Sequence, residues 1–366
     1  MTTGDRTWKP LELVKVTAEY LVSKQVPNPR LDAELLMVAT LGLKDRCNLY
    51  AGFEREISGK ELAGYRELVR RRAAREPVSR ILGRREFMGI NFQVTPDVFS
   101  PRPETELLVE TALDVVRPGR EKSMMTPGKT CMAGNPGGDG NLPEELIRAL
   151  DMYGADADET DLREFELPQP IGETPLRHPP NPPERRGKAS VPGYEGPILD
   201  LGTGSGCVAV ALAALLPAAR VIAVDASAKA LGVAGRNAAE AGVADRVEFR
   251  QGDWFGGCRS GETFALILSN PPYLVDGDPD IWPEVSRYDP PAALYAGGGG
   301  LDCFRRIIPP SLQWLAPGGR IFLEVGAGQA AAVTGFLRNA GYIESAVVRD
   351  YGGMERVVTG MAPAAG

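Results

Sequence analysis

The sequence predicts an α/β fold: a doubly wound, mostly parallel sheet closed by an antiparallel hairpin and preceded by a small helical bundle. Three observations lead to this prediction. Short apolar runs alternate with helical stretches from residue 197 onward. Two β-like runs near the C-terminus, SAVVRDYG and ERVVTGM, are separated by only a tight turn. Residues 1–83 carry apolar side chains at helical spacing.

Residues 1–83 are expected to form several helices with short polar connections, as in a small bundle. The runs are LELVKVTAEYLVSK, RLDAELLMVATLGL and ISGKELAGYRELVRRRAAREP. The third begins at Ser58 with Glu61 three residues later, which is the spacing of a capping box. The cluster of Arg70, Arg71, Arg72 and Arg75 allows two interpretations, a surface for a partner or a solvated helix face.

Two further segments connect this bundle to the sheet. The sequence of residues 84–116 predicts a β-hairpin around Gly89, followed by a connecting helix that begins near Pro103. Residues 117–196 contain 12 prolines and 11 glycines, a proportion typical of low-complexity sequence. Such a composition buries too little apolar surface to offset its ordering entropy, so we expect a largely disordered insertion.

The sheet is expected within residues 197–366. Its strands are the nearly continuous apolar runs PILDLG, RVIAVD, VEFRQG, FALILSN and RIFLEVG. The helical stretches CVAVALAALL and SAKALGVAGRNAAEAG lie between the first three. Strands buried on both faces and alternating with helices are typical of a parallel sheet, in which ligands bind at the carboxyl ends of the strands.

Composition excludes several classes of protein. The net charge of −7 argues against a protein held mainly by nucleic-acid phosphates. No apolar run approaches the roughly 20 residues that span a bilayer, and the start, MTTGDRTWKP, shows no signal pattern. The five cysteines are scattered without a C-x-x-C pair, which predicts a cytoplasmic protein without structural zinc.

The chain contains a single histidine, His178, and it lies in the proline-rich stretch RHPPNPPERR. A Ser-His-Asp triad, a Cys-His pair and a multi-histidine metal site are therefore not expected, and no metal is predicted. Any catalysis must proceed without a histidine base.

A glycine loop follows the first strand of the sheet, in ILDLGTGSGCVAVALA. Gly202, Gly204 and Gly206 have the spacing G-x-G-x-G, whereas a dinucleotide fingerprint would need a glycine where Cys207 stands. Asp225 ends the second strand, where an acid can accept hydrogen bonds from both ribose hydroxyls of a nucleoside. The third strand leads into Asp253 and Trp254, which can hold an adenine, although Trp254 also fits an ordinary core position. Together these features imply S-adenosylmethionine.

The fourth strand ends at Asn270, followed by Pro271, Pro272 and Tyr273. The prolines stiffen this loop at the edge where the cofactor is expected. The Asn270 side-chain oxygen can accept one hydrogen of a substrate amide, and the Pro271 carbonyl the other. Tyr273 can pack on the flat face of that group. The motif predicts methylation of a planar, amide-like or aminopurine nitrogen, and the alternative is a plain proline turn.

The combination of motifs resembles a known family. GRREFMGINFQVTPDVFSPRPETELLVE, ILDLGTGSGCVAVALA, GDWF, SNPPYL, RYDPPAALYAGGGGLD and RDYGGMERVV look like the peptide-chain release-factor glutamine methyltransferases, the PrmC/HemK family. The resemblance covers nearly all of residues 1–116 and 197–366. It implies a class I S-adenosylmethionine-dependent methyltransferase, with a Rossmann-like seven-stranded mixed sheet and a terminal antiparallel hairpin. The N-terminal helices would then recognise the substrate.

The resemblance also implies a substrate and a set of site residues. The substrate would be the glutamine of the Gly-Gly-Gln loop in class 1 release factors. Apart from the resemblance, we expect the protein to be a monomer. Asn270, Pro271, Pro272 and Tyr273 would grip that glutamine. The residues implied for the cofactor are Gly202, Thr203, Gly204, Ser205, Gly206, Asp225, Trp254 and Asn270. Three alternatives stay open: a ribosomal-protein glutamine methyltransferase, an amine methyltransferase acting on nucleic acid, and a non-enzymatic interaction protein.

Overall fold

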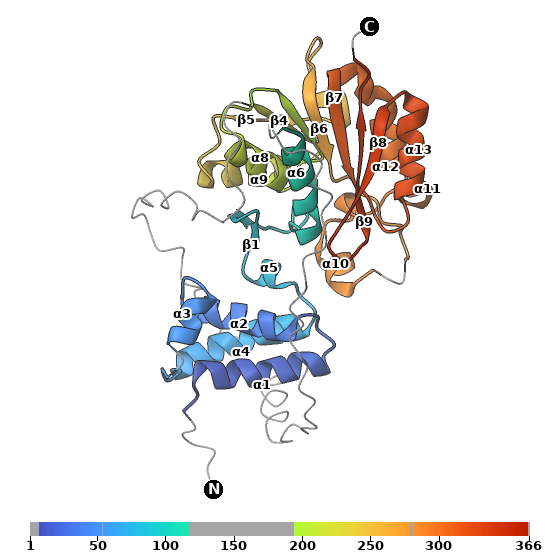
Figure 1. Ribbon diagram of the computed structural model, residues 1–366. Helices are drawn as coiled ribbons and strands as arrows, with labels where there is room; N and C mark the ends of the chain where they lie inside the picture. Colours follow the sequence, from blue (N-terminus) through green and yellow to red (C-terminus); the bar gives the residue numbers. More distant parts are fainter. Residues whose placement is uncertain (1–6, 53, 117–193, 279–280, 365–366) are drawn as a thin grey trace. The chain divides into compact units, whose positions relative to one another are not determined.

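The computed structural model describes residues 7–52, 54–116, 194–278 and 281–364. The expected disordered insertion at 117–196 lies outside these residues except for its last three. The described chain divides into two compact units, residues 7–82 and residues 83–364 without their gaps (Figure 1). Within the described residues no helix is long and apolar enough to cross a membrane. These residues also contain no group of three or more His, Cys, Asp or Glu side chains that could hold a metal ion.

The first unit is a bundle of helices, as the spacing of apolar residues predicts. Its elements are α1 (Pro10–Ser23), α2 (Pro29–Thr40), α3 (Arg46–Ala51), α4 (Gly59–Ala73) and α5 (Val78–Ile81). The capping box at the start of α4 is present: the Ser58 side chain accepts from the Glu61 backbone, and the Glu61 carboxylate accepts from the Ser58 backbone. Apolar side chains of α1, α2 and α4, among them Val14, Leu36 and Leu68, form one buried core.

The arginine cluster divides between two environments: Arg70 is exposed and pairs with Glu67 on a solvated helix face, whereas the other three arginines make contacts within the bundle. Arg72 is buried and forms an ion pair with Asp32 of α2, with Nε 2.7 Å from Oδ2. Arg71 pairs with Glu76, and Arg75 donates to the carbonyl of Gln25 at 2.7 Å. These contacts lie within the bundle, so the cluster helps to hold its helices together. Removing one partner of a buried pair such as Arg72–Asp32 leaves an uncompensated charge and costs about 3–5 kcal/mol.

The second unit contains a small hairpin and a large sheet. The hairpin consists of β1 (Arg84–Phe87) and β2 (Ile90–Gln93), paired antiparallel. Its turn residues Met88 and Gly89 both have positive φ, which suits the twist of a two-residue hairpin. The expected helix follows as α6 (Pro103–Val116). The Met88 N–H donates to Glu106 of α6 at 2.7 Å, so hairpin and helix are tied together.

The large sheet has seven strands in the order β5-β4-β3-β6-β7-β9-β8. The strands β3 to β7 are parallel, and β9 pairs antiparallel with β7 and β8. The strands are β3 (Ile198–Leu201), β4 (Val221–Asp225), β5 (Val247–Gln251), β6 (Phe264–Ser269), β7 (Leu315–Glu324), β8 (Ile343–Arg349) and β9 (Glu355–Met361). This is the mixed, hairpin-closed sheet of class I methyltransferases, and the predicted fold class is confirmed.

Helices cover both faces of the sheet (Figure 1). One core joins α6, α8 (Cys207–Leu215) and α9 (Ala228–Glu240) to strand residues such as Ile198, Leu266 and Leu268. The other joins α12 (Asp302–Ser311) and α13 (Ala330–Ala340) to Leu199 and Ile267. Neighbouring strand residues thus face opposite cores, which explains the continuous apolar runs in the sequence. Between β6 and α12 lie α10 (Pro283–Tyr288) and α11 (Gly297–Gly300).

Candidate active site

The glycine loop lies between β3 and α8, at the carboxyl edge of the sheet. Gly202, Gly204 and Gly206 all have positive φ, with values of 71°, 55° and 81°, which side chains rarely adopt. The N–H groups of Gly202 and Thr203 donate to the carbonyl of Val224 at 2.8 and 3.0 Å, so the loop is held against β4. A Cβ at Gly206 would lie 2.9 Å from the Ala234 Cβ of α9, closer than real contacts allow. The loop therefore presents bare backbone at the sheet edge.

Asp225, at the end of β4, anchors this loop. One carboxylate oxygen accepts from the N–H of Gly204 at 2.8 Å, and the other accepts from the N–H of Ser227 at 2.8 Å. Each oxygen has two lone pairs, so each retains one acceptor position for a further donor. The two ribose hydroxyls expected here would need two such positions. Asp225 can therefore shape the loop and bind a nucleoside at the same time.

A second acid, Asp200 of β3, is buried directly beneath the loop. Thr203 Oγ1 donates to its Oδ2 at 2.6 Å. Burial raises the pKa of Asp200 to about 7. The hydrogen bonds from Thr203 and Ala209 act to lower this pKa, and the charge of Asp225 acts to raise it. In the unfolded chain the same carboxyl titrates near its ordinary value, about 3.9. Its contribution to stability is therefore complete below about pH 4 and is lost as pH rises through about 7.

We expect Asp200→Asn to remove this loss, because asparagine keeps the shape and one acceptor without the charge. The free energy of unfolding of the variant, relative to wild type, should shift in favour of the variant by about 2 kcal/mol between pH 5 and pH 8. Guanidinium titrations of both proteins without cofactor measure this difference. A gap between the two proteins that does not change with pH would contradict the burial effect.

Trp254 begins the short turn (Trp254–Gly257) that follows β5. Its backbone has a φ of 50°, and its ring lies over Gly202, where a Cβ would come within 3.5 Å of Cζ3. The ring packs against the core on one side, and its buried Nε1 has no hydrogen-bond partner among the described residues. The neighbouring Asp253 is more than half exposed and forms an ion pair with Arg306 of α12. The adenine role of Asp253 and Trp254 stays a prediction.

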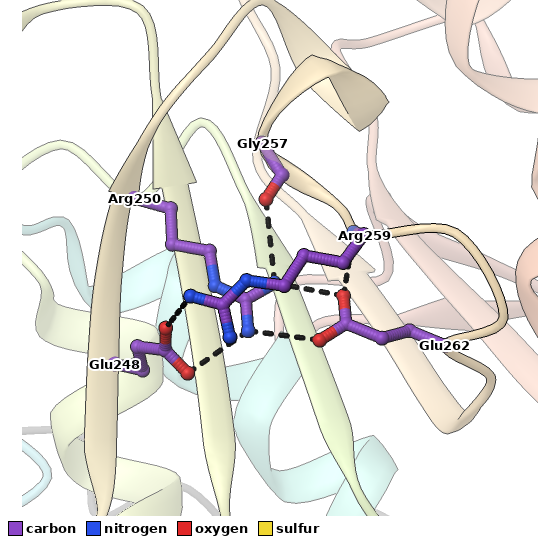
Figure 2. A network of polar contacts seen from close by, with 5 residues as sticks. All are labelled: Glu248, Arg250, Gly257, Arg259 and Glu262. Atoms are coloured by element: carbon purple, nitrogen blue, oxygen red, sulfur yellow. Dashed lines mark hydrogen bonds and ion pairs between the residues drawn. The ribbon is translucent and has the colours of Figure 1, made fainter.

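A network of four charged side chains surrounds Gly257 (Figure 2), which is the last residue of the turn that begins at Trp254. Arg250 of β5 donates to both oxygens of Glu262 at 2.7 and 2.9 Å, to Glu248 at 2.9 Å and to the Gly257 carbonyl at 3.3 Å. Arg259 completes the ring by donating to Glu248 at 2.6 Å. Because Arg250 contacts both ends of residues 257–262, the network fixes this loop against the edge strand.

The Asn-Pro-Pro-Tyr motif follows β6 on the same edge of the sheet. Asn270 is half-buried, and its Nδ2 donates to Thr105 Oγ1 of α6 at 3.0 Å. Tyr273 directs its hydroxyl to Glu324 Oε1 at 3.3 Å, and its carbonyl accepts from Gln329 Nε2 at 2.9 Å. Pro271 is buried and Pro272 half-buried. The motif is thus held by several side chains, which is more than a plain proline turn requires.

Two glycines make room for the motif. A Cβ at Gly300 would collide with the Tyr273 carbonyl oxygen, and a Cβ at Gly326 would lie 3.0 Å from the Tyr273 ring. The side chain of Gln329 connects Tyr273 to Gly326. Its Nε2 donates to the Tyr273 carbonyl, and its Oε1 accepts from the Gly326 N–H at 3.0 Å. The stretches GGGGLD and VGAGQ therefore serve to enclose Tyr273.

Three residues at this site were not singled out from the sequence: Thr105, Glu324 and Gln329. Glu324 ends β7 at the carboxyl edge, just as Asn270 follows β6, so the same placement rule applied to RIFLEVG identifies it. Burial raises the pKa of Glu324 to about 7, while the hydroxyls of Thr105 and Tyr273 act to lower it. Thr105 gave no signal, because it stands in an ordinary helix start.

The residues at this edge fit a nucleoside-containing cofactor. The glycine loop offers bare backbone, where side chains would occupy the space for a ligand. Asp225, which anchors the loop, keeps free acceptor positions, and the ring of Trp254 lies beside the loop. Asn270 and Tyr273 follow the next strand in the sheet order, since β6 pairs with β3. The structure therefore brings the predicted glycine loop, acid and proline motif to one edge.

Comparison with known proteins gives a consistent result. Residues 12–83 match a family model described as the PrmC N-terminal domain, and residues 188–285 match one described as the methyltransferase small domain. A release factor glutamine methyltransferase of Geobacter sulfurreducens is 35% identical over 98% of this chain and 99% of its own length. Proteins of the same name from Rhodopirellula baltica and Cereibacter sphaeroides are 31% and 32% identical over 98% and 97% of this chain, and 98% and 99% of their own lengths. A solved methyltransferase from Pyrococcus furiosus is 17% identical, and the match covers 48% of this chain and 77% of that one at a TM-score of 0.37.

Proposed function

This chain belongs to the family of release factor glutamine methyltransferases, and we propose that it methylates the glutamine of the Gly-Gly-Gln motif in class 1 peptide chain release factors. The methyl group is added to the side-chain amide nitrogen. The observation that carries the proposal is the amide side chain of Asn270, held by Thr105 at the sheet edge that also carries the glycine loop.

The proposed methyl donor is S-adenosylmethionine, which supplies an electrophilic methyl group when bound. Gly202 to Gly206 offer their backbone to it, and Asp225 accepts from its ribose hydroxyls while holding Gly204 and Ser227. Trp254, fixed over Gly202, stacks against the base. Asn270 is the last of the residues proposed to bind the cofactor, and we place it at the end that carries the methyl group.

The glutamine is gripped by the Asn-Pro-Pro-Tyr motif. Asn270 Nδ2 is occupied by Thr105, which leaves Oδ1 to accept one hydrogen of the substrate amide. The Pro271 carbonyl accepts the other hydrogen, and Tyr273 packs beside the planar group. Two fixed acceptors determine the direction of the nitrogen lone pair. Well-oriented reactants recover on the order of 7–11 kcal/mol of barrier, so catalysis here needs no histidine.

The partner is a class 1 release factor, and the N-terminal helices are proposed to bind it. Residues 12–83 match the PrmC N-terminal domain, and they form a compact helical unit with its own core. We expect the enzyme to act as a monomer in the cytoplasm, where translation terminates.

One experiment tests the substrate. The protein is incubated with labelled S-adenosylmethionine and a purified class 1 release factor, and the modified residue is mapped by mass spectrometry. A release factor whose Gly-Gly-Gln glutamine is replaced by alanine serves as the control. We expect label on that glutamine alone. Label on a ribosomal protein or an oligonucleotide, but not on the release factor, would assign the enzyme to one of the alternative substrate classes.

A further inference from the structure

The amide of Asn270 can face the substrate in two ways, and only one of them works. An asparagine side chain carries an acceptor oxygen on one side and a two-proton donor on the other. With Oδ1 toward the substrate it accepts an amide hydrogen. Rotated by half a turn, it would present its own N–H groups to the N–H groups of the glutamine. Something must therefore select the orientation.

Thr105 is placed to make this selection. It lies in the first turn of α6, is buried, and accepts from Asn270 Nδ2 at 3.0 Å. The two residues are 165 positions apart in the sequence, so this contact exists only in the folded unit. A hydroxyl can also donate, however, and a donating Thr105 would stabilise the rotated asparagine instead. The direction of the hydrogen bond therefore needs a cause.

Glu324 provides that cause. Its carboxyl is buried at the end of β7, and burial raises its pKa, while the hydroxyls of Thr105 and Tyr273 act to lower it. Tyr273 donates to Oε1 at 3.3 Å, and Oε2 has no hydrogen-bond partner among the described residues. An ionised carboxylate only accepts, so a Thr105 hydroxyl that bonds to it must donate, which leaves the Thr105 lone pairs to Asn270.

We infer that Thr105 and Glu324 are positioning residues that orient the Asn270 side chain, so that its oxygen faces the substrate amide. The inference rests on the proposed function and deepens it. Neither residue is assigned a contact with the substrate. Thr105 acts through Asn270, and Glu324 acts through Thr105 and Tyr273. The effect of each should therefore appear in turnover and not in cofactor binding.

The primary test replaces the hydroxyl of Thr105. Thr105→Val keeps the shape but offers no acceptor, so the amide of Asn270 is free to rotate. We expect the single-turnover rate of release-factor methylation to fall at least tenfold, with S-adenosylmethionine affinity by calorimetry changed less than twofold. Thr105→Ser restores the hydroxyl and should recover most of the rate. Thr111→Val is the matched control, because within the described part of the chain the Thr111 hydroxyl bonds only to the Leu107 carbonyl of the same helix. Its rate should stay within twofold of wild type.

A second test separates orientation from general damage to the site. Aspartate at position 270 has two equivalent oxygens, so its rotation changes nothing for the substrate. In the Asn270→Asp background, Thr105→Val should therefore cost less than threefold. An equal loss in both backgrounds would show that Thr105 supports the local packing and does not select an orientation. A Thr105→Val rate equal to wild type would also overturn the inference.

The pH profile tests Glu324. The groups facing its carboxyl are Thr105 and Glu104 of α6, Tyr273, and Arg356 of β9, with Glu104 raising and Arg356 lowering the pKa. Below about pH 7 the carboxyl becomes protonated and can donate, so the direction of the hydrogen bonds is lost. The rate at saturating cofactor should fall as pH drops from 8 to 6 in wild type and in Asp200→Asn. The Glu324→Gln variant should methylate more slowly than wild type at pH 8, and its rate should not fall between pH 8 and pH 6. A fall in rate identical to that of wild type would show that Glu324 is not the positioning residue.

The outcomes distinguish this inference from the proposed function. If wild type leaves the release-factor glutamine unlabelled, the proposed function fails, whatever the variants do. If wild type labels it and the Thr105 and Glu324 variants behave as wild type, only the positioning role fails. Melting temperatures of all variants are measured in parallel, and Thr105→Ser reports on the hydroxyl should Thr105→Val not fold.

Discussion

Replacing Asn270 with alanine is expected to abolish nearly all methyl transfer while sparing most of the affinity for S-adenosylmethionine. The variant removes the oxygen proposed to accept one substrate hydrogen, and it also removes the partner of Thr105. The substrate amide can then rotate, and its nitrogen spends little time in line with the methyl group. Loss of orientation depresses turnover far more than ground-state binding. Single-turnover methylation of an intact release factor measures the effect.

Asn270→Asp is the matched control for this prediction. A carboxylate accepts the same hydrogen bond, so partial activity should remain. If Asn270→Ala keeps more than about a tenth of the wild-type rate, the amide-gripping role is wrong, because a hydrogen bond worth only 1.4 kcal/mol in the transition state accounts for that factor. The motif would then act only as a rigid turn after β6.

Replacing Asp225 with alanine is expected to weaken S-adenosylmethionine binding by a few kcal/mol and to lower stability. Two ribose hydroxyls would lose their acceptor, at about 1–3 kcal/mol for each group left buried without a partner. The structure adds a second cost, because the N–H groups of Gly204 and Ser227 lose the carboxylate that holds them. The fold should be retained with a lower melting temperature. Calorimetry and thermal unfolding measure the two effects separately.

Asp225→Asn provides the comparison, since it keeps the shape and one acceptor oxygen. We expect its affinity and melting temperature to lie between those of wild type and the alanine variant. Unchanged cofactor affinity in Asp225→Ala would refute the ribose assignment, even if the melting temperature falls. That combination would leave Asp225 as a purely structural anchor of the glycine loop.

The sequence by itself determined the fold class and the position of the main motifs. Strand runs such as FALILSN are apolar throughout because both faces of β6 pack against helices, and that pattern is visible without coordinates. The capping box at Ser58 and the turn at Gly89 depend on neighbouring residues only, so they were also predictable. Asn270 and Asp225 could be placed at one edge because parallel strands end on the same side.

Only the tertiary structure decided which side chains meet. Arg72 belongs to a run of arginines whose role the sequence does not decide. It is buried because α2 brings Asp32 against α4. Thr105 comes from α6, Glu324 and Gln329 come from the segment that ends β7 and leads into α13, and all three converge on Asn270 and Tyr273. The physical reason is the range of the interaction. Periodicity and capping act over a few residues, whereas these polar side chains find their partners by packing between elements 40 to 165 residues apart.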